Sequence, residues 1–146
     1  MELDARALRD RYLAAQLRGD RREALRLLVD EGLGRGFSVP ELQLQVIQEA
    51  QREIGRLWEE NRIGIAQEHM ATAISQLALA HLYQYATPSE TNGKHVVIAC
   101  VEGELHELPA RLAADALDLA GFGVRFLGAN VPTDSLLSLL QRDPPD

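Results

Sequence analysis

The chain has 146 residues, a mass of 16.2 kDa and a formal net charge of −7. This length suits one ordinary domain or two small ones, which excludes a multidomain enzyme. Apolar residues make up 46% and charged residues 25%, and these globular proportions exclude a disordered tail and a membrane protein. No apolar run approaches the roughly 20 residues that span a bilayer, and the N-terminus is charged from its second residue, so we expect a cytoplasmic protein.

The charge pattern and the single cysteine narrow the expected partners. Residues 1–35 carry 8 Arg against 7 acidic residues, whereas the two later stretches, 36–90 and 91–146, are both acidic. A duplex-binding surface concentrates Lys and Arg on one face, so we expect no direct nucleic-acid binding by this chain. Cys100 has no cysteine to pair with, which agrees with a reducing compartment.

Residues 1–86 place apolar side chains at helical spacing in four successive stretches. The first stretch ends at Gly19, the second ends in a glycine-rich segment, the third begins at Ser38 as a capping residue and ends near Asn61, and the fourth follows a short turn. Short connections favour antiparallel neighbours, so these residues predict a four-helix bundle. Its expected apolar faces comprise Leu3, Ala7, Leu8, Tyr12 and Ala15; Ala24, Leu25, Leu27, Leu28 and Leu33; Leu42, Val46, Ala50, Ile54, Leu57 and Trp58; and Met70, Ala73, Ile74, Leu77, Leu82 and Tyr85.

The pattern changes after a polar linker at residues 87–94. Residues 95–101 form a β-branched run that predicts a strand buried on both faces of a parallel sheet. A helix over 109–119, with Leu112, Ala113, Ala116, Leu117 and Ala120 on its apolar face, and a strand over 124–128 complete a βαβ unit, and Thr133 is the expected cap of a last helix over 134–140. Two strands fall short of the usual 4 to 6 or so. Residues 95–146 are therefore expected to be an incomplete first part of a flavodoxin-like domain, giving an α plus α/β fold.

The loop after the first predicted strand carries the sequence's best candidate site. Ligands bind at the carboxyl ends of strands in doubly wound sheets, and this loop contains Glu104 and His106. A carboxylate two residues before a histidine can accept a hydrogen bond from the ring nitrogen that does not ligate a metal. The alternative is a solvated acidic turn that contains an ordinary histidine.

A helical bundle followed by a strand, an acidic-x-His turn and a helix resembles the cobalamin-binding module of methionine synthase and corrinoid proteins. That family's motif is Asp-x-His-x-x-Gly, and here Glu104 and His106 match it with Glu in place of Asp. The resemblance implies that His106 is the lower axial ligand of cobalt and that Glu104, Leu105 and Pro109 lie in the cofactor site. Pro109 stands where the family has glycine; it suits the first turn of a helix and lacks a backbone donor.

A second motif, Trp58 followed after nine residues by Glu68 and His69, is similar to the cap of the CarH-type regulators, which sense light through adenosylcobalamin. The resemblance implies that the bundle covers the upper face of the corrin, with Trp58 near the adenosyl group and Glu68 and His69 lining that cavity. An indole suits an apolar cover, and a carboxylate and an imidazole can meet ribose hydroxyls. On periodicity alone, Trp58 would continue the core stripe of Leu57, and the other two residues would be a polar shoulder of a helix.

Three departures qualify this resemblance. Glu59 occupies the position at which some members carry a histidine that takes the upper axial position after light, so His69 is the nearest substitute. The winged-helix DNA-binding domain that usually begins such regulators is absent from this sequence. The later segments that surround the nucleotide tail are also missing, so about half of a full cobalamin-binding domain is expected.

These observations predict a light-sensing, cobalamin-binding regulatory domain rather than an enzyme, with adenosylcobalamin as cofactor and methylcobalamin as the other possibility. The upper-face residues would change conformation or assembly on photolysis, so a homo-oligomer or a partner protein is expected. Two alternatives remain open. One is a corrinoid carrier that shuttles a methyl group between methyltransferases, and the other is a dimerising module that no longer binds cobalamin.

Overall fold

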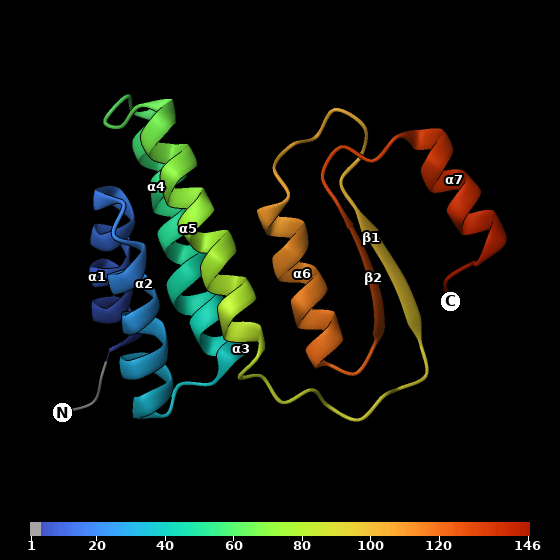
Figure 1. Ribbon diagram of the computed structural model, residues 1–146, viewed down its shortest axis with the longest axis horizontal. Coiled ribbons are helices and arrows are strands. Elements are labelled where there is room, and N and C mark those ends of the chain that lie inside the picture. The colour runs from blue at the N-terminus through green and yellow to red at the C-terminus, as the bar shows by residue number, and fades with distance from the viewer. Residues whose placement is uncertain (1–3) are drawn as a thin grey trace. The chain divides into compact units, whose positions relative to one another are not determined.

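The computed structural model describes residues 4–146, which divide into two compact units, one ending at Ala86 and the other running from Thr87 to Asp146 (Figure 1). Leu3, which the sequence assigned to the first apolar stripe, lies outside the described residues.

The first unit begins with α1, Ala5–Arg18, and a second helical stretch made of α2, Arg21–Arg26, η1, Leu27–Gly32, and η2, Leu33–Arg35. The Asp4 side chain accepts a hydrogen bond from the Arg6 amide at the start of α1, and Gly19 ends this helix with a φ of 73°. This left-handed conformation favours glycine, and a Cβ at Gly19 would lie only 2.6 Å from Met70 Sδ. The predicted end of the first helix is therefore confirmed.

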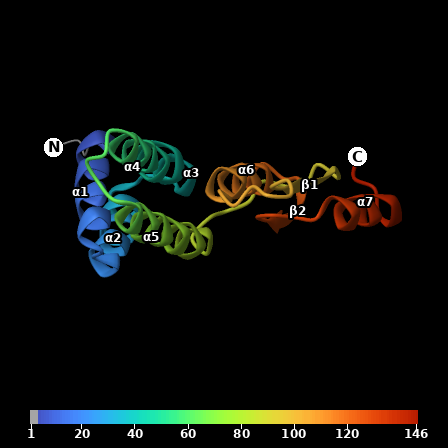
Figure 2. The ribbon, with the colours of Figure 1, turned by 90° about the horizontal axis from the view of Figure 1, so that it is seen from above.

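The third helical stretch comprises α3, Val39–Glu41, η3, Leu42–Gln48, and α4, Glu49–Glu59, and the fourth is α5, Ile65–Tyr83. Ser38 caps the third stretch as predicted, through a capping box in which the Ser38 hydroxyl accepts from the Glu41 amide and the Glu41 carboxylate accepts from the Ser38 amide. The segments η1 and η3 are π-helical, which apolar spacing did not reveal. Figure 2 shows α5 and the α3–α4 stretch as two rows, with α1 and α2 beside them.

The core of the first unit differs in phase from the expected one along α1 and α5. Ala7 is exposed, and the buried face of α1 consists of Leu8, Tyr12, Ala15 and Gln16. Of the predicted stripe, Met70 and Ala73 on α5 and Tyr85 just after it are exposed, and Leu77 is half-buried. The residues of α5 that are buried are Ala71, Ile74, Ser75, Ala78, Leu79 and Leu82. The helix is apolar on nearly every side, so the spacing alone did not select the face that packs.

The second unit contains β1, His95–Ala99, α6, Leu108–Leu119, β2, Gly123–Gly128, and α7, Thr133–Arg142. The strands pair in parallel from His95 opposite Gly123 to Ile98 opposite Phe126, and an irregularity then brings Ala99 opposite Gly128. The parallel pairing that the sequence predicted is confirmed. In Figures 1 and 2, α6 runs alongside these strands as the crossover between them.

Three expectations about the second unit need correction. The strand residues after His95 are half-buried rather than fully buried, because the sheet of the described residues has two strands and is not covered on both faces. On α6, Ala113 and Ala116 are exposed and Ala114 is buried. Thr133 is the first residue of α7, and Pro132 takes the cap position. Apart from these corrections, the segment 87–94 contacts the end of α6, because the amides of Ser89 and Asn92 donate to the carbonyls of Leu119 and Gly121.

Each helix of residues 4–146 is too short or too polar to cross a lipid bilayer.

Candidate functional site

In the second unit, the loop between β1 and α6 is held against the loop that follows β2. The Gly103 amide donates to Asn130 Oδ1 at 2.8 Å, and the Asn130 amide donates to the Glu104 carbonyl at 2.9 Å. Gly103 has a φ of 89° and Asn130 a φ of 51°, so both turns rely on residue types that tolerate the left-handed region. The two loops at the carboxyl edge of the sheet therefore fix each other.

Two further carboxylates join these loops. Glu107 Oε2 accepts from the Ala129 amide at 3.1 Å, and a Cβ at Gly128 would lie 3.0 Å from the same oxygen. Glu102 Oε2 accepts from the amide and the hydroxyl of Thr133, at 3.4 and 3.3 Å. These contacts bracket residues 103–106 from both sides.

Glu104 and His106 form the pair that the sequence predicted. Glu104 Oε1 lies 2.7 Å from both the amide nitrogen and Nδ1 of His106, and the imidazole side chain is 87% exposed. The His106 amide and then its ring hold the pKa of Glu104 below its usual value, so this carboxylate is ionised and accepts both hydrogen bonds. In the neutral imidazole, Nδ1 is then the protonated nitrogen and Nε2 carries a lone pair directed away from Glu104.

The two other candidate residues of this loop also lie at the surface. Leu105, between Glu104 and His106, is 69% exposed. Pro109 is exposed in the first turn of α6, the position where its missing N–H costs nothing. The exposed Leu105 therefore places an apolar side chain directly beside the exposed His106 imidazole.

In the first unit, the other candidate residues lie at one end of the hairpin that α4 and α5 form. The turn between the helices closes with a Schellman motif, in which the Asn61 amide donates to the Trp58 carbonyl at 2.9 Å and the Arg62 amide donates to the Leu57 carbonyl at 2.8 Å. Asn61 has the required positive φ of 58°. Leu57 is buried, but Trp58 is 46% exposed. The core interpretation of Trp58 is therefore wrong.

Glu68 and His69 lie in the first turns of α5, near the same end of the hairpin. Glu68 Oε2 lies 2.5 Å from His69 Nδ1, and the exposed fractions of the two side chains are 19% and 73%. Glu68 Oε1 accepts from the Thr72 hydroxyl at 2.8 Å, and Thr72 Oγ1 accepts from Gln51 Nε2 at 2.6 Å. The Glu68 carboxylate is thus supported from inside the helical unit.

Sequence reasoning missed the residues that support these two groups. The turn-forming Gly128-Ala129-Asn130 after the second strand was a usable signal for the loop, because carboxyl ends of parallel strands lie at one sheet edge. Gln51 and Thr72 carried no comparable signal, since a polar residue within an apolar helix looks the same whether it faces water or a partner.

The remaining histidines lie outside both groups. His81 is half-buried; its Nδ1 lies 3.2 Å from Gln84 Nε2, and its ring meets Tyr85 edge to face at 5.8 Å. His95 lies at the start of β1, with Nδ1 3.5 Å from the Asp146 carboxylate. Within residues 4–146, no three His, Cys, Asp or Glu side chains are grouped in a way that could hold a metal ion by themselves.

Comparison with known families identifies a match over most of the first unit. The B12 binding domain family matches residues 8–83, which is more than half of the chain. This range contains Trp58, Glu68 and His69 and ends before the Glu104–His106 loop.

Three curated relatives extend the comparison. The chain is 36% identical to an uncharacterized 20.5 kDa protein in the bchF-crtJ intergenic region of Rhodobacter capsulatus, over 70% of this chain and 55% of that protein. It is 29% identical to the HTH-type transcriptional repressor CarA of Myxococcus xanthus, over 98% of this chain and 47% of the repressor. It is 33% identical to the repressor CarH of the same organism, over 58% of this chain and 27% of the repressor. The chain therefore spans about half or less of the length of these relatives.

A solved structure has the same fold. The monomethylamine corrinoid protein of Methanosarcina barkeri aligns with a TM-score of 0.78 and 17% identity, covering 95% of this chain and 65% of that protein. At this identity the likeness concerns the fold.

Proposed function

Because this chain belongs to the B12 binding domain family, we propose that it is a cobalamin-binding, light-sensing regulatory domain in which His106 ligates cobalt from below. The chain is related in sequence to the CarA and CarH repressors and in fold to a corrinoid protein. The finer proposal rests on one observation above others, which is the contact of Glu104 with Nδ1 of an exposed His106.

The residues of this loop fit a cobalt ion in a corrin ring. A cobalt ion held in a corrin ring would need one nitrogen from the protein, and the exposed His106 imidazole, whose Nδ1 is held by the Glu104 carboxylate, would supply it through Nε2. Glu104 holds the ring in the tautomer that leaves Nε2 free to act as a ligand. The contacts of Asn130 with Gly103 and of Glu107 with Ala129 hold the loop that carries this pair. Neither contact involves His106 Nε2, the atom that would face the cofactor.

The first unit provides residues suited to the upper ligand. When bound, adenosylcobalamin supplies a cobalt–carbon bond that light can break and a ribose with free hydroxyls. Trp58 offers an exposed indole face for the adenosyl group, and Glu68 and His69 offer a hydrogen-bond acceptor and a polar ring. The residue directly after Trp58 is Glu59, which has no imidazole to offer to cobalt. His69 is therefore the residue of this group that could ligate the metal after illumination.

The proposed output is a change of conformation. Trp58 would lose its packing partner if light removed the adenosyl group, and the first unit would then relax to a state with different surface contacts. A partner protein or a second copy of the chain would read this change. The regulator proposal takes the adenosyl form as the cofactor.

The lower-ligand proposal is tested by comparing wild type with His106→Ala and with His81→Ala as the matched histidine control. We expect His106→Ala to weaken cobalamin binding at least about tenfold and to lose the spectrum of imidazole-ligated cobalt, because no other nitrogen of the loop replaces Nε2. His81→Ala should bind like wild type. Equal binding and equal spectra of the two variants would refute the ligand role of His106.

The upper-face proposal is tested by Trp58→Ala with Tyr85→Ala as control, since both aromatic side chains are about half exposed in the first unit. In Trp58→Ala, the rate of the light-induced spectral change should differ from that of wild type, and the change of assembly should be lost. Tyr85→Ala should behave like wild type in both measurements. If dark binding of adenosylcobalamin and the light response both survive that change, the cap role of Trp58 is wrong.

A corrinoid methyl carrier is the second candidate, favoured by the fold shared with the monomethylamine corrinoid protein. A carrier presents cobalt to partner enzymes and has no use for an adenosyl cavity. Tighter binding of methylcobalamin than of adenosylcobalamin would favour the carrier, and the reverse preference favours the sensor. A chain that binds neither methylcobalamin nor adenosylcobalamin would be a dimerising module that does not bind the cofactor.

A further inference from the structure

A chain of polar side chains, some fully buried and some half-buried, runs through the first unit and ends at Glu68. Tyr12 and Gln16 of α1, Gln51 of α4 and Ser75 of α5 meet in the core, and Tyr12, Gln16 and Ser75 are fully buried. Ser75 Oγ lies 3.2 Å from the Tyr12 hydroxyl, 2.8 Å from Gln16 Nε2 and 3.0 Å from Gln51 Oε1. Gln51 Nε2 then reaches Thr72, and Thr72 reaches Glu68.

The direction of each hydrogen bond follows from the donors present. A glutamine Nε2 only donates, so Gln16 donates to Ser75 and Gln51 donates to Thr72. The single proton of Ser75 goes to Gln51 Oε1, which only accepts. Ser75 must therefore accept from Tyr12, whose phenol stays protonated because burial raises its pKa.

The last donor in this chain is the Thr72 hydroxyl. Its oxygen accepts from Gln51, so its single proton is available for Glu68 Oε1. Hydrogen bonds that all run in one direction polarise one another and reinforce the final bond. The chain thus ends on an acceptor, the Glu68 carboxylate, which is also the point where the helical unit meets solvent.

We infer that Thr72 and Gln51 are positioning residues that hold the Glu68 carboxylate as a hydrogen-bond acceptor for the hydroxyl groups of an upper ligand. This inference rests on the proposed function, in which Glu68 faces the adenosyl group. One oxygen of Glu68 accepts from Thr72 and the other meets His69, and a carboxylate with about four acceptor sites still has room for a vicinal diol. The ligand class selected is a ribose-bearing upper ligand, because a methyl or hydroxo ligand has no diol to donate.

The positioning role predicts a loss of selectivity rather than a loss of cobalamin binding. Thr72→Val keeps the shape of the side chain and removes the hydroxyl that both accepts from Gln51 and donates to Glu68. We expect adenosylcobalamin to bind about tenfold more weakly, whereas methylcobalamin should change by less than about twofold, since hydrogen bonds to charged groups have the larger effect. Thr72→Ser restores the hydroxyl and should restore the selectivity.

The experiment measures dissociation constants of adenosylcobalamin and methylcobalamin for wild type, Thr72→Val, Thr72→Ser, Gln51→Met and Glu68→Ala. Gln51→Met removes the preceding link and should lower the selectivity about threefold, which keeps the inference testable if Thr72→Val does not fold. If Glu68→Ala leaves the selectivity of wild type unchanged, the proposed role of Glu68 fails and the inference falls with it. If Glu68→Ala abolishes selectivity but Thr72→Val and Gln51→Met do not, the positioning role alone is wrong.

A measurement without cofactor tests the geometry separately. The side-chain amide protons of Gln51 should exchange slowly with water in wild type and in Thr72→Ser, because one of them is bonded to Thr72. They should exchange at least about tenfold faster in Thr72→Val. Equal exchange rates in the three proteins, measured by NMR, would contradict the hydrogen-bonded chain itself.

Discussion

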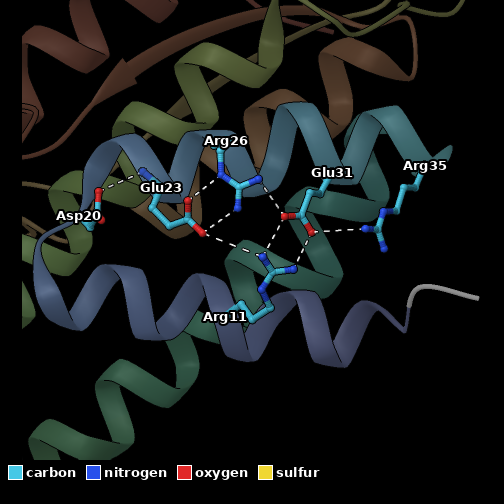
Figure 3. A network of polar contacts seen from close by, with 6 residues as sticks. All are labelled: Arg11, Asp20, Glu23, Arg26, Glu31 and Arg35. Atoms are coloured by element: carbon cyan, nitrogen blue, oxygen red, sulfur yellow. Dashed lines mark hydrogen bonds and ion pairs between the residues drawn. The ribbon is translucent and has the colours of Figure 1, made fainter.

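Arg11 and Tyr12 are neighbours on α1, yet their side chains belong to two polar networks of opposite character. Arg11 forms a bidentate contact with Glu31, with distances of 2.5 and 2.8 Å, and Glu31 also meets Arg26 and Arg35 (Figure 3). The three arginine side chains of this network are nearly half exposed. Tyr12, by contrast, is fully buried and bonded to Ser75.

The two networks differ in how they contribute to stability. The exposed network joins α1 to the second helical stretch through ion pairs that water and salt screen, so each pair contributes little to stability. The buried network joins α1, α4 and α5 through neutral groups that would each lose free energy if left unpaired. Only the buried network leads to a candidate functional residue, Glu68. Substitutions in the buried network should therefore alter both the free energy of unfolding and the ligand selectivity.

The largest expected effect on stability comes from Ser75→Ala. Ser75 joins Tyr12, Gln16 and Gln51, so its loss leaves buried donors and an acceptor without their partner. We expect the free energy of unfolding to fall by about 1–3 kcal/mol, measured by urea denaturation. Ser138→Ala on the exposed face of α7 is the control and should change it by less than about 0.5 kcal/mol. A loss no larger than that of the control would show that the buried network is not tightly formed.

A smaller effect is expected from Tyr12→Phe. The ring keeps its packing, and the only change is the hydroxyl that donates to Ser75. The expected decrease in the free energy of unfolding is about 0.5–1.5 kcal/mol, again from urea denaturation. Tyr85→Phe, whose side chain is 48% exposed, should be neutral. Equal results for the two tyrosines would contradict the contrast between buried and exposed polar groups.

The contribution of the exposed network to stability should depend on pH. The bidentate contact with Arg11 lowers the pKa of Glu31 from 4.5 to about 2. A depressed carboxylate pKa contributes stability above the unfolded value, and this contribution is lost as pH falls from about 4.5 to about 2. The melting temperature of Glu31→Gln should therefore fall less steeply than that of wild type over this window. Parallel curves for the two proteins, followed by circular dichroism, would disprove the pairing in solution.

The sequence predicted the elements better than it predicted which side chains they bury. Chemistry at single positions, such as the Ser38 cap and the end of α1 at Gly19, was readable because caps depend on adjacent residues. The buried face of α5 was not, since its composition is apolar nearly all round and the packing partners on α1 decide the phase. Trp58 was assigned by periodicity to the core, but it lies one residue past the last buried position of α4.

The candidate site shows the same division. The Glu104–His106 pair follows from spacing of two residues along the chain and was predicted with its hydrogen bond. Asn130 and Glu107, which hold the loop, come together only through the pairing of two strands. The role of Thr72 could not be predicted from the sequence, because it depends on a hydrogen bond from Gln51 of another helix and on the direction of that bond.

The most direct test of the account is the absorption spectrum of the purified chain after mixing with adenosylcobalamin in darkness, removal of free cofactor and illumination with green light. The account predicts a retained corrinoid with the spectrum of histidine-ligated, base-off cobalamin, and an irreversible change on illumination. A chain that retains no corrinoid, or that retains it with the same spectrum in His106→Ala, would contradict the central claim that this loop binds cobalt.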